Sequence, residues 1–173
     1  MSFDQDGAGD PARRLLAVVD IDGVLADVRH RLHHVRGRPK DWRAFFAAAP
    51  EDPVLAQGLD TVRRLAEVFE IVYLSGRPEH CRSDTETWFE QHGVPQGPLL
   101  LRPFGDHRPA RVVKVEALDR LSRERTVAVL VDDDPMVLDS ARAAGYDVLP
   151  ADWMPSTPDE VALREAQEAE GRT

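Results

Sequence analysis

Carboxylate, hydroxyl and amine side chains recur next to short apolar runs along the chain. These runs end in Asp-Ile-Asp-Gly, in Ser-Gly-Arg and in Asp-Asp-Asp, and a lysine lies near the start of a later helical stretch. Carboxylates packed closely together repel one another unless a hard cation lies among them, and Mg²⁺ takes one or two carboxylates plus a phosphate oxygen. A lysine offers a point charge for a phosphate or an acyl phosphate. The residues concerned are Asp20, Asp22, Ser75, Lys114, Asp132 and Asp133.

The apolar runs themselves predict about five strands of a parallel sheet. Continuous apolar runs bounded by turn residues are typical of strands buried on both faces. Helical stretches alternate with them, which predicts an α/β fold with helices on both faces of the sheet. Ligands bind beyond the carboxyl ends of such strands, so the polar residues are expected at one rim. The expected strands are 14–19, 69–74, 99–101, 127–131 and 146–149, and the expected helices are 53–68, 78–92, 110–121 and 135–144.

One stretch interrupts this alternation. Residues 26–52 contain no strand-like run, and such a length is typical of a functional insertion, here a small helical one. Residues 29–43 hold six lysine and arginine residues against one aspartate, a local formal charge of +5 in a chain of −9. Trp42, Phe45 and Phe46 supply an apolar anchor. Two interpretations stay open: the basic stretch guides a polyanionic substrate to the rim, or it is a solvated face.

Composition excludes several classes of protein. The length of 173 residues predicts one domain with a small insertion. No apolar run approaches ~20 residues, so no membrane partner is expected. Cys81 is the only cysteine, which excludes a disulfide framework and a cysteine zinc site within one chain and favours a reducing cytoplasm. The net charge of −9 disfavours coating nucleic acid by bulk electrostatics.

The two ends of the chain carry weaker signals. Residues 1–12 are acidic and polar, unlike a signal peptide, and are expected to form a flexible arm. Residues 157–160, Thr-Pro-Asp-Glu, have the form of a capping box that starts a helix. That helix has a thin apolar stripe, so the tail 155–173 is expected to be peripheral or frayed.

Taken together, the motifs resemble those of the haloacid dehalogenase (HAD) superfamily. Residues 20–24 (Asp-Ile-Asp-Gly-Val) match the first motif, DxDx[TV], and Ser75 and Lys114 match the second and third. Residues 132–133 (Asp-Asp) match the fourth, in the expected order. The resemblance covers roughly residues 15–150. It implies a Rossmann-like HAD core and assigns residues 13–154 to one phosphatase domain.

The resemblance also implies a Mg²⁺-dependent phosphomonoesterase that acts through an aspartyl-phosphate. Asp20 would attack phosphorus. Asp22 would protonate the leaving oxygen and then activate water. Ser75 and Lys114 would hold the phosphate oxygens. The implied metal ligands are the Asp20 side chain, the Asp22 carbonyl and Asp132, with Asp133 completing the acidic shell.

A narrower resemblance points to the 3′-phosphatase domain of phage-type polynucleotide kinase-phosphatases. It is carried by residues 75–77 (Ser-Gly-Arg), 105–108 (Gly-Asp-His-Arg), 112–114 (Val-Val-Lys) and 131–133 (Val-Asp-Asp), whereas the insertion matches poorly. It implies that the substrate is a phosphate at a DNA or RNA 3′ end. The implied substrate-binding residues are Ser75, Gly76, Arg77, Asp106 and Arg108.

Two other functions stay open from the sequence. The same chemistry could act on a nucleotide or another small phosphomonoester, or the fold could serve as a non-catalytic module that binds a phosphate or a partner. The retained Asp20, Asp22, Lys114 and Asp132 argue against the second. No G-x-x-x-x-G-K-[ST] sequence occurs, so any kinase or ligase is expected on a separate chain.

Overall fold

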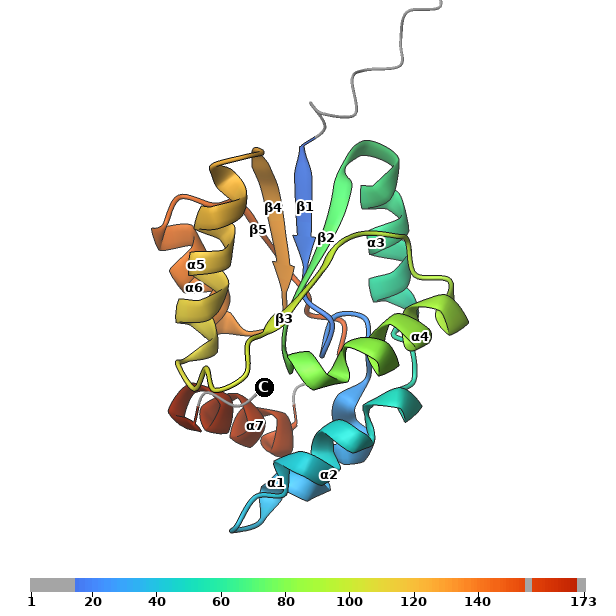
Figure 1. Cartoon of the computed structure of the whole chain (residues 1–173), viewed down its shortest axis with the longest axis vertical. Coiled ribbons are helices and arrows are strands. Elements are labelled where there is room, and N and C mark those ends of the chain that lie inside the picture. The colour runs from blue at the N-terminus through green and yellow to red at the C-terminus, as the bar shows by residue number, and fades with distance from the viewer. Residues whose placement is uncertain (1–14, 155–156, 171–173) are drawn as a thin grey trace, which may run out of the picture.

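Five parallel strands form a central sheet in the order β3-β2-β1-β4-β5 (Figure 1). The computed structural model describes residues 15–154 and 157–170. At the centre, Val18 of β1 pairs with Val72 of β2 on one side and with Leu130 of β4 on the other. The expected parallel α/β sheet is therefore confirmed. The strands are β1 (Leu16–Val19), β2 (Glu70–Pro78), β3 (Leu99–Arg102), β4 (Val127–Asp132) and β5 (Val148–Pro150).

Alternate strand residues enter two separate cores, one on each face of the sheet. Ala17 and Val19 of β1 pack in the core that includes side chains of α3 and α4. Leu16 and Val18 pack in the core that includes side chains of α5 and α6. In Figure 1, α5 and α6 lie on one side of the sheet and α3 and α4 on the other. Burial on both faces explains why the strands read as continuous apolar runs. The helices are α3 (Ala56–Val68), α4 (Arg82–His92), α5 (Ala110–Ser122) and α6 (Pro135–Ala143).

Two helices begin later than the sequence indicated. Residues 53–55 stay extended, because Val54 forms a bridge with Ala26 and the Leu55 N–H donates to the carbonyl of Leu25. Strand β2 continues through Pro78, and a 3₁₀ turn, η4 (Glu79–Cys81), precedes α4. Local pairing with a neighbouring segment outweighs helix propensity at both places.

The insertion folds into four short helical segments at the carboxyl end of the sheet. Asp27 and Asp41 cap two of them by accepting hydrogen bonds from backbone N–H groups. Apolar side chains that include Val28, Phe45 and Phe46 form a third core outside the sheet. The segments are η2 (Val28–Arg31), α1 (His33–Arg36), α2 (Trp42–Ala47) and η3 (Ala49–Glu51).

Helix α7 (Pro158–Glu170) requires a correction to the expected tail. It is neither peripheral nor frayed over its described length, because Leu163 and Ala166 are buried in the third core with the insertion. Lys40 and the Trp42 indole both donate hydrogen bonds to Glu170, and Arg36 pairs with Asp159. The thin apolar stripe is thus enough for docking, since the insertion supplies apolar and basic partners.

The start of α7 agrees with its sequence signal. Glu160 accepts a hydrogen bond from the Thr157 N–H at 2.7 Å, and the Glu160 N–H donates to the Thr157 hydroxyl at 3.3 Å, so the capping box is confirmed. The arm expected over residues 1–12 lies outside the described residues. Within 15–154 and 157–170, no helix is long and apolar enough to cross a membrane.

Candidate active site

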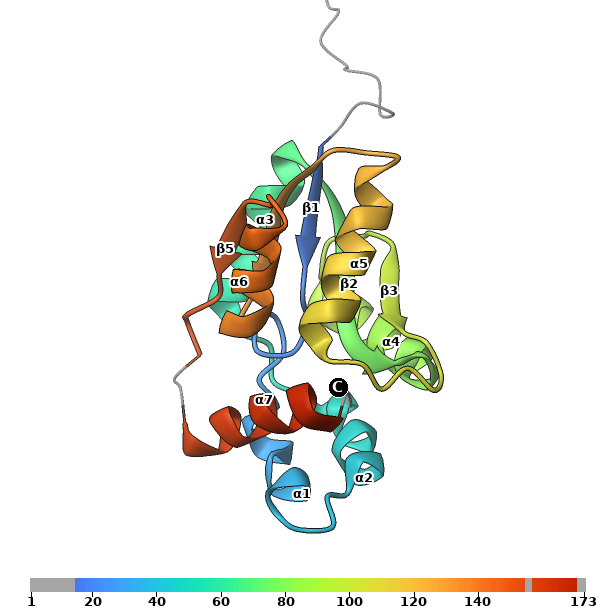
Figure 2. The same cartoon turned by 90° about the vertical axis from the view of Figure 1, so that its left-hand side faces the viewer.

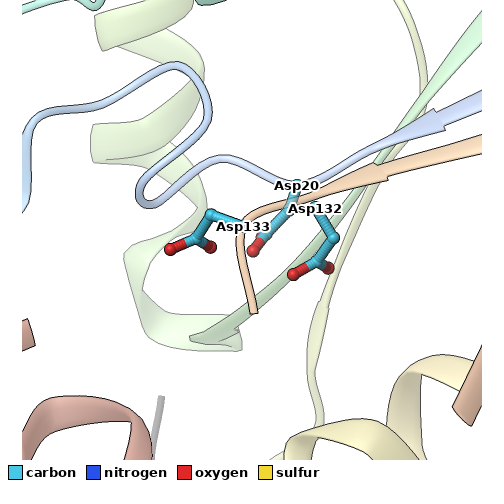
Figure 3. Close-up of side chains that lie close together, drawn as sticks. All are labelled: Asp20, Asp132 and Asp133. Atoms are coloured by element: carbon cyan, nitrogen blue, oxygen red, sulfur yellow. The ribbon is translucent and has the colours of Figure 1, made fainter. Parts of the chain in front are cut away.

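Strands β1 and β4 are neighbours, and their carboxyl ends bring three aspartates together. Figure 3 shows the carboxyl groups of Asp20, Asp132 and Asp133 close together where these strands end. One oxygen of each lies within 4.8 Å of the others. The Asp20 N–H donates to the carbonyl of Val131 at 2.9 Å, which fixes the two strand ends in register. The cluster therefore rests on the sheet itself rather than on a separate loop.

Lys114 reaches this cluster from α5. Its Nζ donates to Asp20 Oδ2 and to Asp132 Oδ2, both at 2.7 Å. Burial disfavours the charged amine, but Asp132 and Asp20 outweigh it and raise the pKa of Lys114 above its ordinary value. Lys114 is thus a fixed positive charge between two of the three carboxylates.

One lysine does not balance three carboxylates. Burial raises the pKa of Asp20 well above its usual value, and Asp132 and Asp133 raise it further, although Lys114 opposes them. Burial and Asp132 raise the pKa of Asp133 to about 7, although Arg164 opposes this. Both shifts mean that the cluster lacks positive charge. A convergent set of hard oxygen donors with excess negative charge fits a divalent cation such as Mg²⁺.

Gly23 gives Asp133 its place in the cluster. Gly23 has a φ of +79°, a backbone conformation that other residues rarely adopt. A Cβ at this position would also collide with the carboxylate of Asp133. Position 23 therefore requires glycine both for its positive φ and for the space that the Asp133 carboxylate occupies.

Asp22 lies beside the cluster and is held by two arginines. Its Oδ1 accepts hydrogen bonds from Arg31 Nη2 at 2.9 Å and from Arg77 Nη2 at 2.5 Å. Burial alone would raise the pKa of Asp22, but Arg31 and Arg77 outweigh burial and lower the pKa to about 2. Asp22 is therefore a carboxylate at neutral pH, and its two arginine partners make it a weak base. It must first gain a proton before it can donate one.

Asp52 completes this arrangement and was not singled out from the sequence. Its Oδ2 accepts hydrogen bonds from Arg31 Nη2 at 2.8 Å and from Arg77 Nη2 at 2.9 Å. Arg31 and Asp52 are 0% and 1% exposed, and the Arg31 guanidinium lies 4.2 Å from the centre of the Phe45 ring. Arg31 was counted with the basic surface of the insertion, but it is an internal positioning group. We call Asp22, Arg31, Asp52 and Arg77 the buried ion network.

Arg77, expected among the substrate-binding residues, is a member of the buried ion network. Arg77 is 1% exposed, and its guanidinium contacts Asp22, Asp52 and the Thr85 hydroxyl. It is absent from the wall of the cavity around Asp20. In this structure its guanidinium holds the carboxylates of Asp22 and Asp52, and contact of Arg77 with a substrate phosphate stays a prediction.

Asp106 and Arg108 also lie away from Asp20. Arg108 donates to Asp106 at 2.8 Å and pairs with Glu116 at 2.9 Å on the surface. Neither residue lines the cavity around Asp20. The structure does not bring this pair to the wall of the cavity around Asp20, and Arg108 is paired with Asp106 and Glu116 instead.

The cavity around Asp20 is small and covered by α7. Ser75, Gly76 and Lys114 line it on the sheet side, and Leu163 and Arg164 line it on the α7 side. Its volume is about 40 Å³, against ~300–1,000 Å³ for typical ligand sites. Arg164 donates to Asp133 Oδ2 at 3.0 Å and so closes the cover onto the cluster. Entry of any phosphate ester requires α7 to move.

Ion pairs to the insertion are expected to hold α7 in place. In a variant with both Arg36→Glu and Lys40→Glu, the pairs with Asp159 and Glu170 become repulsive. Exposed pairs contribute roughly 0.2–1 kcal/mol each, so we expect amide hydrogen exchange over 158–170 to accelerate by roughly tenfold. Exchange in β1 and β4 should not change. Arg38→Glu is the matched control, because Arg38 contacts no acidic side chain in the described chain. Equal amide exchange rates over 158–170 in the unaltered protein, the double variant and Arg38→Glu would show that apolar contacts alone hold α7.

Comparison with known proteins gives one family and one fold. Residues 15–152 match the family described as the polynucleotide kinase PNKP phosphatase domain. No curated protein sequence matches the chain significantly. Among solved structures, the HAD-like hydrolase SP0104 of Streptococcus pneumoniae aligns with a TM-score of 0.53 at 13% identity, over 80% of this chain and 84% of that one.

Two structures of the Pnkp1/Rnl/Hen1 complex, one of them described as an RNA repair complex, align with higher scores. The TM-scores are 0.65 and 0.67 at 22% and 21% identity, each over 82% of this chain. The matched regions are 43% and 46% of the chains in those complexes, so this chain spans less than half of their length. At these identities the alignments show a shared fold.

Proposed function

The chain belongs to the family of the polynucleotide kinase PNKP phosphatase domain, a HAD-family phosphatase, and from this premise we propose that it removes a phosphate from nucleic-acid 3′ ends with the help of Mg²⁺. The observation that carries the proposal is that Asp20, Lys114, Asp132 and Asp133 form one cluster, from which Asp20, Lys114 and Asp133 line a small cavity. A bound Mg²⁺ would neutralise the carboxylates and the phosphate oxygens.

Two aspartates divide the chemistry in this proposal. A carboxylate oxygen of Asp20 attacks phosphorus and forms an aspartyl-phosphate while the bond to the leaving oxygen breaks. A protonated Asp22 gives its proton to that oxygen. Asp22 then takes a proton from a water that attacks phosphorus, which releases inorganic phosphate and regenerates Asp20.

Ser75, Gly76 and Lys114 are the proposed phosphate holders. All three line the cavity beside Asp20. The Ser75 hydroxyl accepts a hydrogen bond from the Arg77 N–H at 3.2 Å, which leaves its own proton to donate to a phosphate oxygen. Lys114 supplies a charge that burial and its two carboxylates keep in place. Asp132 and Asp133 complete the proposed metal site with Asp20.

A second candidate substrate is a nucleotide or another small phosphomonoester. The cover provided by α7 and the volume of about 40 Å³ favour it, because a small ester needs less displacement of α7 than a polynucleotide end. By analogy with the Pnkp1/Rnl/Hen1 complex, we also propose that a kinase or ligase on another chain acts on the same nucleic-acid ends.

Metal-dependent phosphate release tests the proposal. The substrates are a 3′-phosphorylated oligonucleotide, its 5′-phosphorylated twin, mononucleotides and sugar phosphates. We expect release from the 3′ end at least tenfold faster than from the 5′ end. Excess EDTA should remove the activity and Mg²⁺ should restore it, because the acidic cluster needs a cation. A preference for a small ester would shift the assignment to the second substrate class, and activity that is indifferent to EDTA would contradict the metal site.

A further inference from the structure

An apolar hollow of about 240 Å³ lies outside the phosphate cavity, between α2 and the loop that joins β3 to α5. Phe104 on this loop is fully exposed, more so than any other large apolar side chain of the described chain. Trp42 and Phe46 of α2 form the opposite wall. Figure 2 shows α2 and this loop on the same side of the molecule, next to the C-terminal end of α7. The exposed Phe104 ring and the aromatic side chains of the hollow together form an apolar surface that is open to a ligand.

The hollow continues into a second one of about 590 Å³. Both are lined by Trp42 and His107, and Arg38 and Lys40 line the second. Arg43 and His80 line the first. We call the two hollows together the aromatic groove and define it by Arg38, Trp42, Arg43, Phe46, Phe104 and His107.

The groove has an excess of available positive charge. The acidic side chains in its walls are Asp106 and Glu170, and both are already paired, with Arg108 and with Lys40. Arg38 and Arg43 form no ion pair within the described residues. A groove that combines aromatic faces with free guanidinium groups suits an anionic ligand with flat rings, which is the chemistry of single-stranded nucleic acid.

The aromatic groove begins next to the phosphate cavity. Gly76 lines the cavity and Pro78, two residues further along the extended β2, lines the groove. Two extended residues span at most about 7 Å. Ala110 lines the cavity and His107 lines the groove three residues earlier, so a second segment connects the two. Once α7 has moved from the cavity, a ligand with its terminal phosphate at Asp20 can therefore place its adjoining residues in the groove.

We propose that the aromatic groove binds the nucleotides next to the terminal phosphate of a single-stranded polynucleotide. A base stacks on Phe104, and backbone phosphates lie near Arg43 and Arg38. The inference rests on the proposed function and specifies how this chain would distinguish a polynucleotide from a mononucleotide. Stacking on an aromatic side chain tolerates any base, so the groove adds affinity without sequence preference.

Binding is tested in the Asp20→Asn background with a fluorescent 3′-phosphorylated single-stranded oligonucleotide and fluorescence anisotropy. Phe104→Ala is expected to weaken binding by roughly tenfold, and Phe104→Tyr to retain it, because a tyrosine ring also stacks. Arg43→Gln should lower the slope of log K against log salt by about 0.7. Val68→Ala, which truncates an exposed apolar side chain on α3, is the matched control.

Turnover in the otherwise unaltered protein separates the groove from the catalytic proposal. Phe104→Ala should lower kcat/KM for the oligonucleotide by roughly tenfold and leave a 3′-mononucleotide unchanged. Equal loss on both substrates, unchanged oligonucleotide binding, or a dimer that dissociates on Phe104→Ala would overturn the groove. Failure of the proposed function would appear instead as no phosphate release from any substrate. The anisotropy measurement alone would then test whether the aromatic groove binds the oligonucleotide.

Discussion

Asp20→Asn is expected to lower phosphate release by roughly 10⁴-fold or more while the protein stays folded. The loss follows because an amide cannot attack phosphorus. The fold should survive because burial, and then repulsion from Asp132 and Asp133, raise the pKa of Asp20 and so disfavour its charged form, which a neutral amide of the same shape replaces. Single-turnover kinetics with a 3′-phosphorylated oligonucleotide measures the first effect, and thermal unfolding measures the second.

Asp60→Asn is the matched control, because Asp60 is exposed on α3 and does not line the cavity around Asp20. It should change neither measurement. When turnover is stopped with acid, the unaltered protein should carry an acid-trapped phosphate, and the Asp20→Asn protein should carry none. Turnover within a few-fold of the unaltered protein would remove Asp20 as the nucleophile, whatever the metal dependence.

The sequence predicts the sheet and the acidic cluster because both depend on local patterns. The central strands β1 and β2 are buried on both faces, so their apolar runs are unbroken, and polar residues follow these runs directly. Parallel topology then brings Asp20 and Asp132 to one rim without further information. Lys114 is predictable in the same way, because it lies near the start of the helix that precedes β4.

The partners of individual charged side chains are not predictable in this way. Arg31 lies in a basic stretch and looks like a surface residue, yet it is buried against Phe45 and Asp52. Asp52 is thirty positions after Asp22 in sequence and has no motif around it. Arg77 was expected at a phosphate because an arginine follows Ser75 and Gly76. In the structure it donates to the carboxylates of Asp22 and Asp52, and the folded insertion brings the second of these near.

Helix α7 shows the same limit at the level of an element. Its capping box predicts where it starts, because that signal is contained in four residues. Its docking depends on Leu163 meeting an apolar surface that the insertion forms more than 110 residues earlier. An acidic tail and a basic insertion are both visible in the sequence, but their pairing needs the geometry of the rim between them.

Asp52→Ala is expected to lower the free energy of unfolding by roughly 3–5 kcal/mol. Asp52 is 1% exposed and bridges two arginines that are themselves almost fully buried. Removing its carboxylate leaves Asp22 as the remaining acidic partner of Arg31 and Arg77. Two buried positive charges then face one negative charge. Urea unfolding at neutral pH measures the difference. Asp60→Ala, the truncation of an exposed aspartate on α3, should change stability by less than ~0.5 kcal/mol.

Phosphate release shows whether the buried ion network also positions Asp22. Without Asp52, both guanidinium groups lose the anchor that aims them at Asp22 Oδ1, so kcat should fall more than KM rises. Asp52→Asn keeps an acceptor oxygen for the arginines but removes the charge, and we expect values between those of the unaltered protein and Asp52→Ala. A stable, fully active Asp52→Ala protein would mean that Asp22 alone holds both arginines. The low pKa of Asp22 would then depend on its contacts with Arg31 and Arg77 and not on Asp52.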